Sequence, residues 1–295
     1  PRGKNSVMMV LNYLSFVVSG FFWVLLTKIK ADYVFIFEVS PMTQALPGVW
    51  YAKKHKLPCY LYVQDLWPEN VEIITGIKNR IIIGAIGSMV DYLYRSCAKI
   101  FATSESFVES INQRGVPKDK VEYWPQYAED FYKPLGKINH PEISEDGAFN
   151  VIFTGNIGYA QGLDILPRAA QIIKAKKQNK IRFNIVGDGR FKSEFIETVN
   201  DMQVREMFSF VPKQAASGIP EIVAACDVAF LSLSDNPLFT MTIPAKLQSY
   251  LACGIPIVAS AAGETARIIA ESKGGLCSKP TEAGGLADNI LALSQ

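Results

Sequence analysis

The chain has 295 residues, and 49% of them are hydrophobic, so it is too apolar for a disordered protein and long enough for about two domains. Its 30 basic and 28 acidic residues give a net charge of +2 and are spread along the chain. A nucleic-acid groove needs a dense stripe of lysine and arginine, so nucleic acid is not the expected partner. The two histidines, His55 and His140, lie in polar stretches and are too few for a His-rich zinc site, which also disfavours a Ser-His-Asp hydrolase.

Two features of the chain bear on its origin. It begins with Pro1 and ends with Gln295, directly after a helical pattern that has no capping residue, so we expect a fragment truncated at both ends. Its five cysteines form no C-x-x-C pair and lie mostly in apolar runs, which is typical of a reduced, cytosolic chain.

The first predicted element is an uncharged apolar segment, residues 6–27. Arg2 and Lys4 precede it, and Lys28 and Lys30 follow it. By length and apolarity the segment could cross a membrane, lie on a membrane surface, or pack as a buried helix. The sequence excludes none of the three, but of these it favours the buried packing helix.

Two observations disfavour a spanning helix. Asn5, Asn12 and Ser19 recur every seven residues and form a narrow polar stripe along a helix. In addition, the segment 34–39 is a predicted sheet strand, and a spanning helix before it would separate this strand from any earlier strand of the same sheet.

After residue 32 the chain alternates short strand patterns with longer helical patterns. The predicted strands are 34–39, 59–63, 100–103, 121–124, 151–154, 183–186, 208–211, 228–233 and 257–259. The predicted helices between them include 81–97, 163–178, 193–202 and 245–253. This alternation predicts an α/β fold of doubly wound parallel sheets covered on both faces.

One stretch interrupts the alternation. Residues 133–148 contain two prolines and two glycines and few large apolar side chains, so they are the predicted linker. The predicted domains are a partial N-terminal one, 1–132, and a C-terminal one, 149–295. In such sheets ligands bind outside the carboxyl ends of the strands, so the loops there are the candidate functional segments.

The first of these loops is rich in glycine. Gly155, Asn156 and Gly158 follow the strand 151–154, and Gln161 with Gly162 opens the next helix. Glycine lets the backbone approach a ligand closely, and the free N–H groups of a helix start favour a phosphate. A tight turn required only for packing would show the same pattern.

The next strand is followed by a similar loop, in which Gly187 and Gly189 precede Arg190. Two such loops on successive strands favour a diphosphate more than either does alone. The alternative is a pair of ordinary turns with a solvated arginine.

The third loop makes a family resemblance specific. Pro244-Ala245-Lys246 precedes a short helix, then Ala252-Cys253-Gly254 and a strand that starts after Pro256. This segment resembles the donor-binding segment of the family-4, GT-B glycosyltransferases. The glycine turn at 155–162, the helix at 219–220 before 225–228, and Gly263-Glu264 follow in the order of that family, so the resemblance covers residues 32–295.

The N-terminal half narrows the resemblance. Ser40-Pro41 follows one predicted strand, and Asp65-Leu66-Trp67-Pro68-Glu69 follows the next. Carboxylates suit sugar hydroxyls, and an indole offers an apolar face to a sugar ring. Within the family the chain is similar to bacterial O-antigen and colanic-acid transferases of the L-fucosamine transferase type.

The resemblance implies a retaining transfer of a sugar from a UDP-type nucleotide donor to a lipid-linked saccharide in surface polysaccharide biosynthesis, and it suggests L-fucosamine as the type of sugar. It implies no cofactor, and because the chain has no D-x-D triplet, it gives no sign of a metal site. The implied location is the cytoplasmic face of the inner membrane, with the protein bound peripherally.

The resemblance also implies site residues. Lys246, with Arg190, would stabilise the charge on the leaving group, a contribution of a few kcal/mol for each such donor. Asp65 would receive the acceptor proton, with Glu69 as the reserve, and Ser40 and Trp67 would lie on the acceptor side. The expected donor-binding residues are Gly155, Asn156, Gly158, Gln161, Gly187, Gly189, Arg190, Val211, Thr242, Ile243, Pro244 and Ser249.

The chain departs from the family pattern at several positions. Many members have two glutamates eight positions apart in the third loop, where this chain has Met241 and Ser249. Asn156 and Gln161 stand where members often have arginine and lysine. Gln64 stands about where many relatives have a histidine beside the acceptor. Backbone amides near Thr242 and Ile243 could replace one of the missing carboxylates.

Three other functions remain possible on the sequence. A sugar-nucleotide epimerase shares the GT-B fold, although two poorly placed histidines disfavour it. A nicotinamide-dependent dehydrogenase would need a G-x-G-x-x-G turn, which the Gly155 turn does not match. A non-catalytic fragment would result if truncation removed strands of the N-terminal sheet and left an apolar edge exposed.

Overall fold

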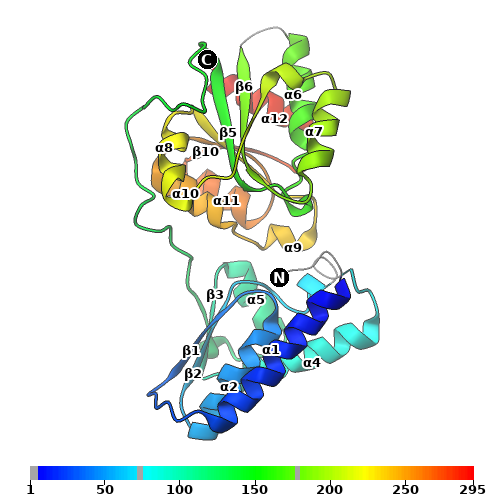
Figure 1. The fold of residues 1–295 in the computed structure, drawn as a ribbon, viewed down its shortest axis with the longest axis vertical. Helices are drawn as coiled ribbons and strands as arrows, with labels where there is room; N and C mark the ends of the chain where they lie inside the picture. The colour runs from blue at the N-terminus through cyan, green and yellow to red at the C-terminus, as the bar shows by residue number, and fades with distance from the viewer. Residues whose placement is uncertain (1–5, 72–75, 177–179) are drawn as a thin grey trace. The chain divides into compact units, whose positions relative to one another are not determined.

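The computed structural model describes residues 6–71, 76–176 and 180–295 and divides the chain into two compact units. Unit 1 ends at Pro125 and unit 2 begins at Gln126 (Figure 1). The boundary therefore lies before the predicted linker 133–148. Both units are built on parallel sheets, which confirms the predicted α/β class.

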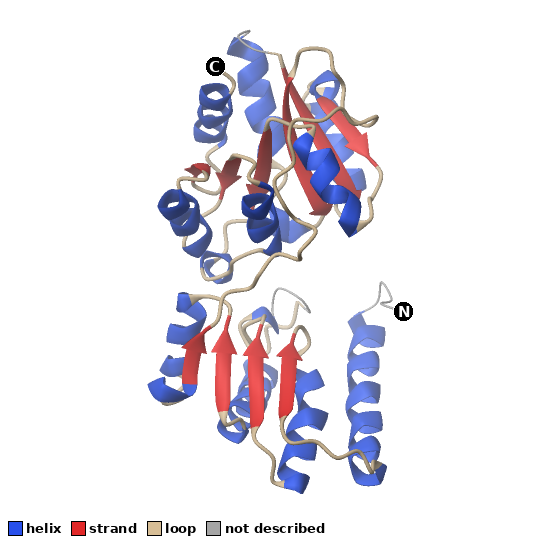
Figure 2. Cartoon of the chain, turned by 90° about the vertical axis from the view of Figure 1, so that its left-hand side faces the viewer, coloured by secondary structure: helices blue, strands red, loops and turns tan. Residues whose placement is uncertain are grey.

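Unit 1 contains a four-stranded parallel sheet in chain order (Figure 2). Its strands are β1 (Val34–Glu38), β2 (Cys59–Val63), β3 (Lys99–Ala102) and β4 (Val121–Tyr123). Its described helices are α1 (Ser6–Leu26), α2 (Ala45–His55), α4 (Arg80–Ser96) and α5 (Glu105–Gln113). The alternation along β1 orients the sheet: Ile36 and Glu38 are buried, whereas Phe35 and Phe37 are about half exposed.

The outer face of this sheet is aromatic. Rings of neighbouring strands contact one another, as Phe37 does with Tyr62 at a centroid distance of 5.5 Å and Phe101 with Trp124 at 4.7 Å. We call this surface the aromatic face; its members are Tyr33, Phe35, Phe37, Tyr60, Tyr62, Phe101 and Trp124. Phe35 and Phe37 on this face are 43% and 48% exposed, so the expectation of a sheet covered on both faces is wrong for the described part of unit 1.

Helix α1 packs against α2 along one narrow seam. Gly20 lies so close to α2 that a Cβ there would lie 2.3 Å from Pro47 Cγ, and Val24 is the most buried side chain of the seam. Lys54 of α2 donates hydrogen bonds from Nζ to the carbonyl oxygens of Val24 and Leu25 at the end of α1. The other sides of the helix are exposed and mostly apolar, which differs from the buried helix that the sequence favours.

No helix in the described part of the chain combines the length and apolarity needed to cross a bilayer. The polar stripe predicted along α1 faces solvent: Ser15 and Ser19 are exposed, and their hydroxyls donate to carbonyl oxygens one turn earlier in the same helix. Asn5 of that stripe lies outside the described residues.

Unit 2 contains a six-stranded parallel sheet in the order β10-β9-β8-β5-β6-β7. Its strands are β5 (Phe149–Asn156), β6 (Ile181–Asp188), β7 (Phe208–Val211), β8 (Val228–Ser232), β9 (Ile257–Ser260) and β10 (Gly275–Ser278). The strand order reverses between β5 and β8, and a doubly wound sheet has its ligand crevice at such a switch point.

Helices cover both faces of this sheet. The helices are α6 (Ile165–Lys176), α7 (Lys192–Asp201), α8 (Ile219–Ala224), α9 (Pro237–Thr240), α10 (Ala245–Cys253), α11 (Glu264–Ser272) and α12 (Ala283–Leu293). One buried core joins α6, α7 and α12 to the sheet through residues such as Phe153 and Phe183. A second core joins α8, α10 and α11 to the other face, through Ile152 and Leu231 among others. Unit 2 therefore has the predicted doubly covered architecture.

Candidate functional site

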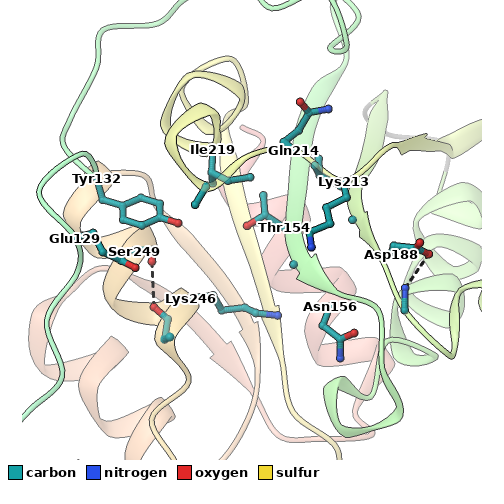
Figure 3. Close-up of a pocket in the computed structure, with 16 residues that line it drawn as sticks. Glu129, Tyr132, Thr154, Asn156, Asp188, Lys213, Gln214, Ile219, Lys246 and Ser249 are labelled. Carbon is teal, nitrogen blue, oxygen red and sulfur yellow. Dashed lines mark hydrogen bonds between the residues drawn. The ribbon is translucent and has the colours of Figure 1, made fainter. Parts of the chain in front are cut away.

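Unit 2 has a pocket of about 670 Å³ beside the carboxyl ends of β5 and β6 (Figure 3). It is lined by Glu129, Tyr132, Thr154, Gly155, Asn156, Val186, Gly187, Asp188, Gly189, Lys213, Gln214, Ala216, Ile219, Ala245, Lys246 and Ser249. Its size lies within the usual range for small-molecule and cofactor sites, roughly 300 to 1,000 Å³.

Two glycine turns form the floor of this pocket because their backbones touch. A Cβ at Gly187 would lie 1.9 Å from the carbonyl oxygen of Gly155, and one at Gly189 would lie 2.2 Å from that of Ile157. Gly155 and Gly187 also have φ angles of +126° and +142°, which residues with a side chain rarely adopt. The two predicted loops thus come together and present backbone rather than side chains to the pocket.

Lys246 lies beside the Gly155 turn, on the first turn of α10. Its Nζ donates a hydrogen bond of 2.6 Å to Gln161 Oε1 and lies 4.0 Å from the centre of the Phe153 ring. Burial lowers the pKa of Lys246 to about 7, since neither neighbour carries a negative charge to offset the lost hydration. An anion bound at the Gly155 turn would supply that missing charge.

Helix α10 is held against the sheet by Tyr250. Its hydroxyl oxygen accepts a hydrogen bond of 2.9 Å from the backbone N–H of Thr154 and lies 3.1 Å from the Thr154 hydroxyl. Burial raises the pKa of Tyr250 to about 12, so this phenol stays neutral at physiological pH. This link positions the helix that carries Lys246 next to the end of β5.

The pocket is lined by five of the twelve predicted donor-binding residues and also by Lys246, which was predicted as catalytic. The five that line it are Gly155, Asn156, Gly187, Gly189 and Ser249. Those that do not are Gly158, Gln161, Arg190, Val211, Thr242, Ile243 and Pro244. Gln161 nevertheless contacts the site indirectly, since it accepts the hydrogen bond from Lys246.

The structure shows where four of the predicted residues outside the pocket lie. Arg190 is exposed beyond the second glycine turn, and Val211 is buried in the core. The N–H of Thr242 donates to the carbonyl oxygen of Phe239 within its own turn. Ile243 packs against the buried core on that side of the sheet.

Several lining residues were not predicted. Lys213 and Gln214 directly follow β7, so the strand-end rule could have found them. Glu129 and Tyr132 come from the irregular segment that opens unit 2. No sequence pattern marks these two residues, and the predicted boundary assigned them to the other domain.

The predicted acceptor-side residues of unit 1 also come together. Asp65 Oδ2 accepts hydrogen bonds from the backbone N–H of Ser40 at 2.9 Å and from its hydroxyl at 2.7 Å. The indole N–H of Trp67 donates to the same hydroxyl at 3.2 Å. Trp67 is only 4% exposed, so its ring does not form the open apolar face that we expected for a sugar.

Buried acids lie next to this group. Glu38, at the end of β1, is fully buried, and neither of its carboxyl oxygens makes a hydrogen bond within the described part of the chain. Burial, and then the charge of Asp65, raises the pKa of Glu38 well above its usual value. Glu69 Oε2 is likewise buried and unpaired within the described residues. Burial therefore favours the neutral form of the Glu38 carboxyl.

Comparison with known proteins identifies relatives of this chain. A family model described as "Glycosyl transferases group 1" matches residues 148–295, which is half of the chain. WbjE of Pseudomonas aeruginosa, described as a glycosyltransferase, is 26% identical over 238 residues, covering 77% of this chain and 57% of the relative. WcaI of Escherichia coli strain K12, described as a colanic acid biosynthesis glycosyl transferase, is 23% identical over 271 residues, covering 86% and 63%. The chain thus spans about three fifths of the length of these relatives.

Solved structures share the fold. Anabaena HepE, determined in complex with UDP and glucose, has a TM-score of 0.68 and 18% identity, covering 88% of this chain and 68% of that one. Sucrose-phosphate synthase from Thermosynechococcus elongatus has a TM-score of 0.61 and 16% identity, covering 84% and 62%. These likenesses show the GT-B type of Rossmann-like fold.

Proposed function

This chain belongs to the glycosyl transferases group 1 family, and from that premise we propose that it acts as a retaining glycosyltransferase with a UDP-linked sugar as donor. The acceptor proposed is a lipid-linked saccharide of bacterial surface polysaccharide synthesis, and L-fucosamine is the sugar that the family resemblance favours. The comparison with WcaI, described by its role in colanic acid biosynthesis, supports this assignment.

The observation that carries the proposal is the meeting of Lys246 with the two glycine turns in one pocket. Close backbone and a partly buried amine without a counter-charge suit a diphosphate, which both N–H groups and an ammonium can bind. The HepE complex with UDP and glucose, formed by a protein of the same fold, supports a nucleotide as the ligand.

In the proposed reaction, this pocket stabilises the departing nucleotide. As the bond between the sugar and the diphosphate breaks, negative charge grows on the leaving oxygen, and Lys246 offsets it from a fixed position. A preorganised donor of this kind contributes roughly a hundredfold to a thousandfold in rate. We propose that no metal ion takes part, so chelation would leave nucleotide binding unchanged.

The proposed acceptor base is Asp65 in unit 1. The acceptor hydroxyl transfers its proton to this carboxylate while its oxygen forms the new bond to the anomeric carbon with retained configuration, and the nucleotide departs. Ser40 orients the carboxylate through its two hydrogen bonds to Oδ2. Glu69 is the alternative base.

The exposed side of α1 supports a peripheral contact with the cytoplasmic face of the inner membrane. Among the large apolar side chains of this helix that are about half exposed, one set recurs every three or four residues: Leu11, Leu14, Val18, Phe22 and Leu25. Lys28 and Lys30 follow the helix in the sequence, and such cations attract anionic lipid headgroups. Sedimentation with phosphatidylglycerol vesicles tests this contact: the chain should bind them, and a Leu14→Asp, Phe22→Asp variant should not.

The central test is calorimetric titration of the chain with UDP, GDP and NAD, with and without EDTA. We expect UDP to bind without metal, and Lys246→Ala to weaken binding by about 1.5 to 3 kcal/mol because a charge-assisted contact is lost. Lys279→Ala is the matched control, since this lysine is exposed and lies outside the pocket.

Two outcomes contradict the proposal. Binding of NAD in place of UDP would favour the dehydrogenase alternative. A folded chain that binds none of the three nucleotides would refute the donor site.

A further inference from the structure

The pocket of unit 2 has two chemically different walls. Lys213, Lys246 and the glycine turns form one wall, which offers cations and backbone N–H groups. Glu129, Tyr132 and Ser249 lie together on the opposite side, as Figure 3 shows. An anion bound at the first wall is repelled by the carboxylate of the second, so a ligand that fills the pocket must have a neutral, hydrogen-bonding part there.

Two residues of the second wall act on each other. Burial first, and also the charge of Glu129, raises the pKa of Tyr132. The backbone N–H of Tyr132 donates to the carbonyl oxygen of Glu129 at 2.9 Å, which sets both residues in one turn. The first residues of unit 2 therefore place the carboxylate of Glu129 and the phenol of Tyr132 on the same wall of the pocket.

Ser249 completes this wall from α10. Its hydroxyl donates to the carbonyl oxygen of Ala245 at 3.2 Å, so toward the pocket its oxygen can act as an acceptor. Glu129 is exposed at the pocket and offers two further acceptor oxygens. Acceptors grouped in this way select a ligand that carries adjacent hydroxyl donors.

We propose that Glu129, assisted by Ser249, binds the two ribose hydroxyls of the nucleotide and makes the pocket selective for ribonucleotides. A nucleoside diphosphate matches both walls, because its vicinal diol and its diphosphate lie on the same ribose. The diphosphate lies toward Lys246 and the diol toward Glu129. This inference rests on the proposed function and assigns a residue that no sequence motif marks.

The test compares UDP with 2′,3′-dideoxy-UDP by calorimetric titration of the full chain. The unmodified chain should bind UDP at least about tenfold more tightly, since the hydroxyls donate to a charged acceptor. Glu129→Gln should weaken UDP binding by about tenfold and leave the affinity for dideoxy-UDP unchanged. The variant keeps the size of the side chain and removes only its charge.

Asp130→Asn is the matched control, because this neighbouring acid is exposed and does not line the pocket. It should bind both nucleotides as the unmodified chain does. Equal affinity of the unmodified chain for UDP and dideoxy-UDP overturns the inference, and so does tighter UDP binding by Glu129→Gln, which would place the carboxylate near the phosphates. Failure of every variant to bind UDP refutes the proposed function itself, so the two failures are distinguishable.

Discussion

The two units use the carboxyl ends of their parallel strands in opposite ways. In unit 2, Gly155 and Gly187 end neighbouring strands, and the lack of side chains leaves backbone exposed to a pocket. In unit 1, Ser40, Asp65 and Trp67 follow neighbouring strands and bond to one another. Strand ends that carry glycine thus leave room for a pocket. Strand ends that carry polar side chains form a closed cluster when those side chains hydrogen-bond to one another.

The two sheets also differ in how far their faces are buried. The sheet of unit 2 is buried by helices on both faces, whereas the aromatic face of unit 1 stays partly exposed within the described residues. All four tryptophans, Trp23, Trp50, Trp67 and Trp124, belong to unit 1. Tryptophan fluorescence therefore reports on unit 1 alone, while circular dichroism reports on both units, so the comparison can be tested directly.

The largest expected effect is that of Gly187→Ala. The new methyl group would collide with the carbonyl oxygen of Gly155 at a φ that disfavours a side chain, so the free energy of unfolding of unit 2 should fall by about 3 kcal/mol. Denaturant unfolding followed by circular dichroism should show the loss, and tryptophan fluorescence should not.

The control for this substitution is Gly284→Ala in α12, where a Cβ would meet open space. There the change should stabilise the helix by roughly 0.5 to 1 kcal/mol. Equal stability of Gly187→Ala and the unmodified chain would contradict the close packing of the two turns.

Ser40→Ala should have the next largest effect. The change removes one hydrogen bond to Asp65 and one from Trp67, so the stability of unit 1 should fall by about 2 kcal/mol. The tryptophan fluorescence transition should shift while the affinity for UDP stays constant. A weakened affinity for UDP would show that the closed cluster of unit 1 is coupled to the pocket.

The pH dependence of UDP binding tests whether Lys246 binds the diphosphate in the pocket of unit 2. Lys246 has a pKa of about 7 in the unliganded chain, and a bound diphosphate favours its charged form, so binding takes up a proton above pH 7. The affinity should therefore fall as pH rises above 7, by up to about tenfold per unit. Titrations at pH 7, 8 and 9 measure the slope. Lys246→Met should remove it, and a slope shared by both chains would contradict this assignment.

The smallest change in stability is expected for Glu38→Gln, which replaces the carboxyl group with a neutral amide of the same shape. Because the pKa of Glu38 is raised in the folded chain, its ionisation favours the unfolded state as pH rises above the usual value of 4.5. The variant should thus match the unmodified chain near pH 4.5 and exceed its stability increasingly toward pH 8. Fluorescence-detected unfolding at both pH values tests this, and a constant difference would show that Glu38 is ionised in the fold.

Local patterns predicted most of the fold. The bounds of β2, β7 and α10 match the prediction to the residue. The helix α10 lies between Pro244, which precedes its first residue, and Gly254, which follows its last. The prediction missed β10, whose sequence Gly-Leu-Cys-Ser lacks the β-branched residues that mark a strand. The strand β6 extends beyond its predicted end, because the glycine that follows pairs with the end of β5.

The candidate site was predicted only in part. Lys246 and the glycine turns could be found because they lie within a few residues of a strand or helix end. Glu129 and Tyr132 could not, since a segment without regular structure carries no period that reveals where it packs. Arg190 follows the right strand but is exposed beyond the pocket, because the direction of a side chain after a turn depends on the path of the turn.

The sequence by itself determined the fold class, the order of most elements and the glycine turns, since these depend on local backbone preferences and on hydrophobic period. The tertiary structure decided which polar groups meet, as Gln161 does with Lys246 and Ser40 with Asp65. It also decided that Glu38 is buried and that one sheet face stays open. Burial, pairing and charge are properties of neighbours in space, and those neighbours come from segments that are distant along the chain.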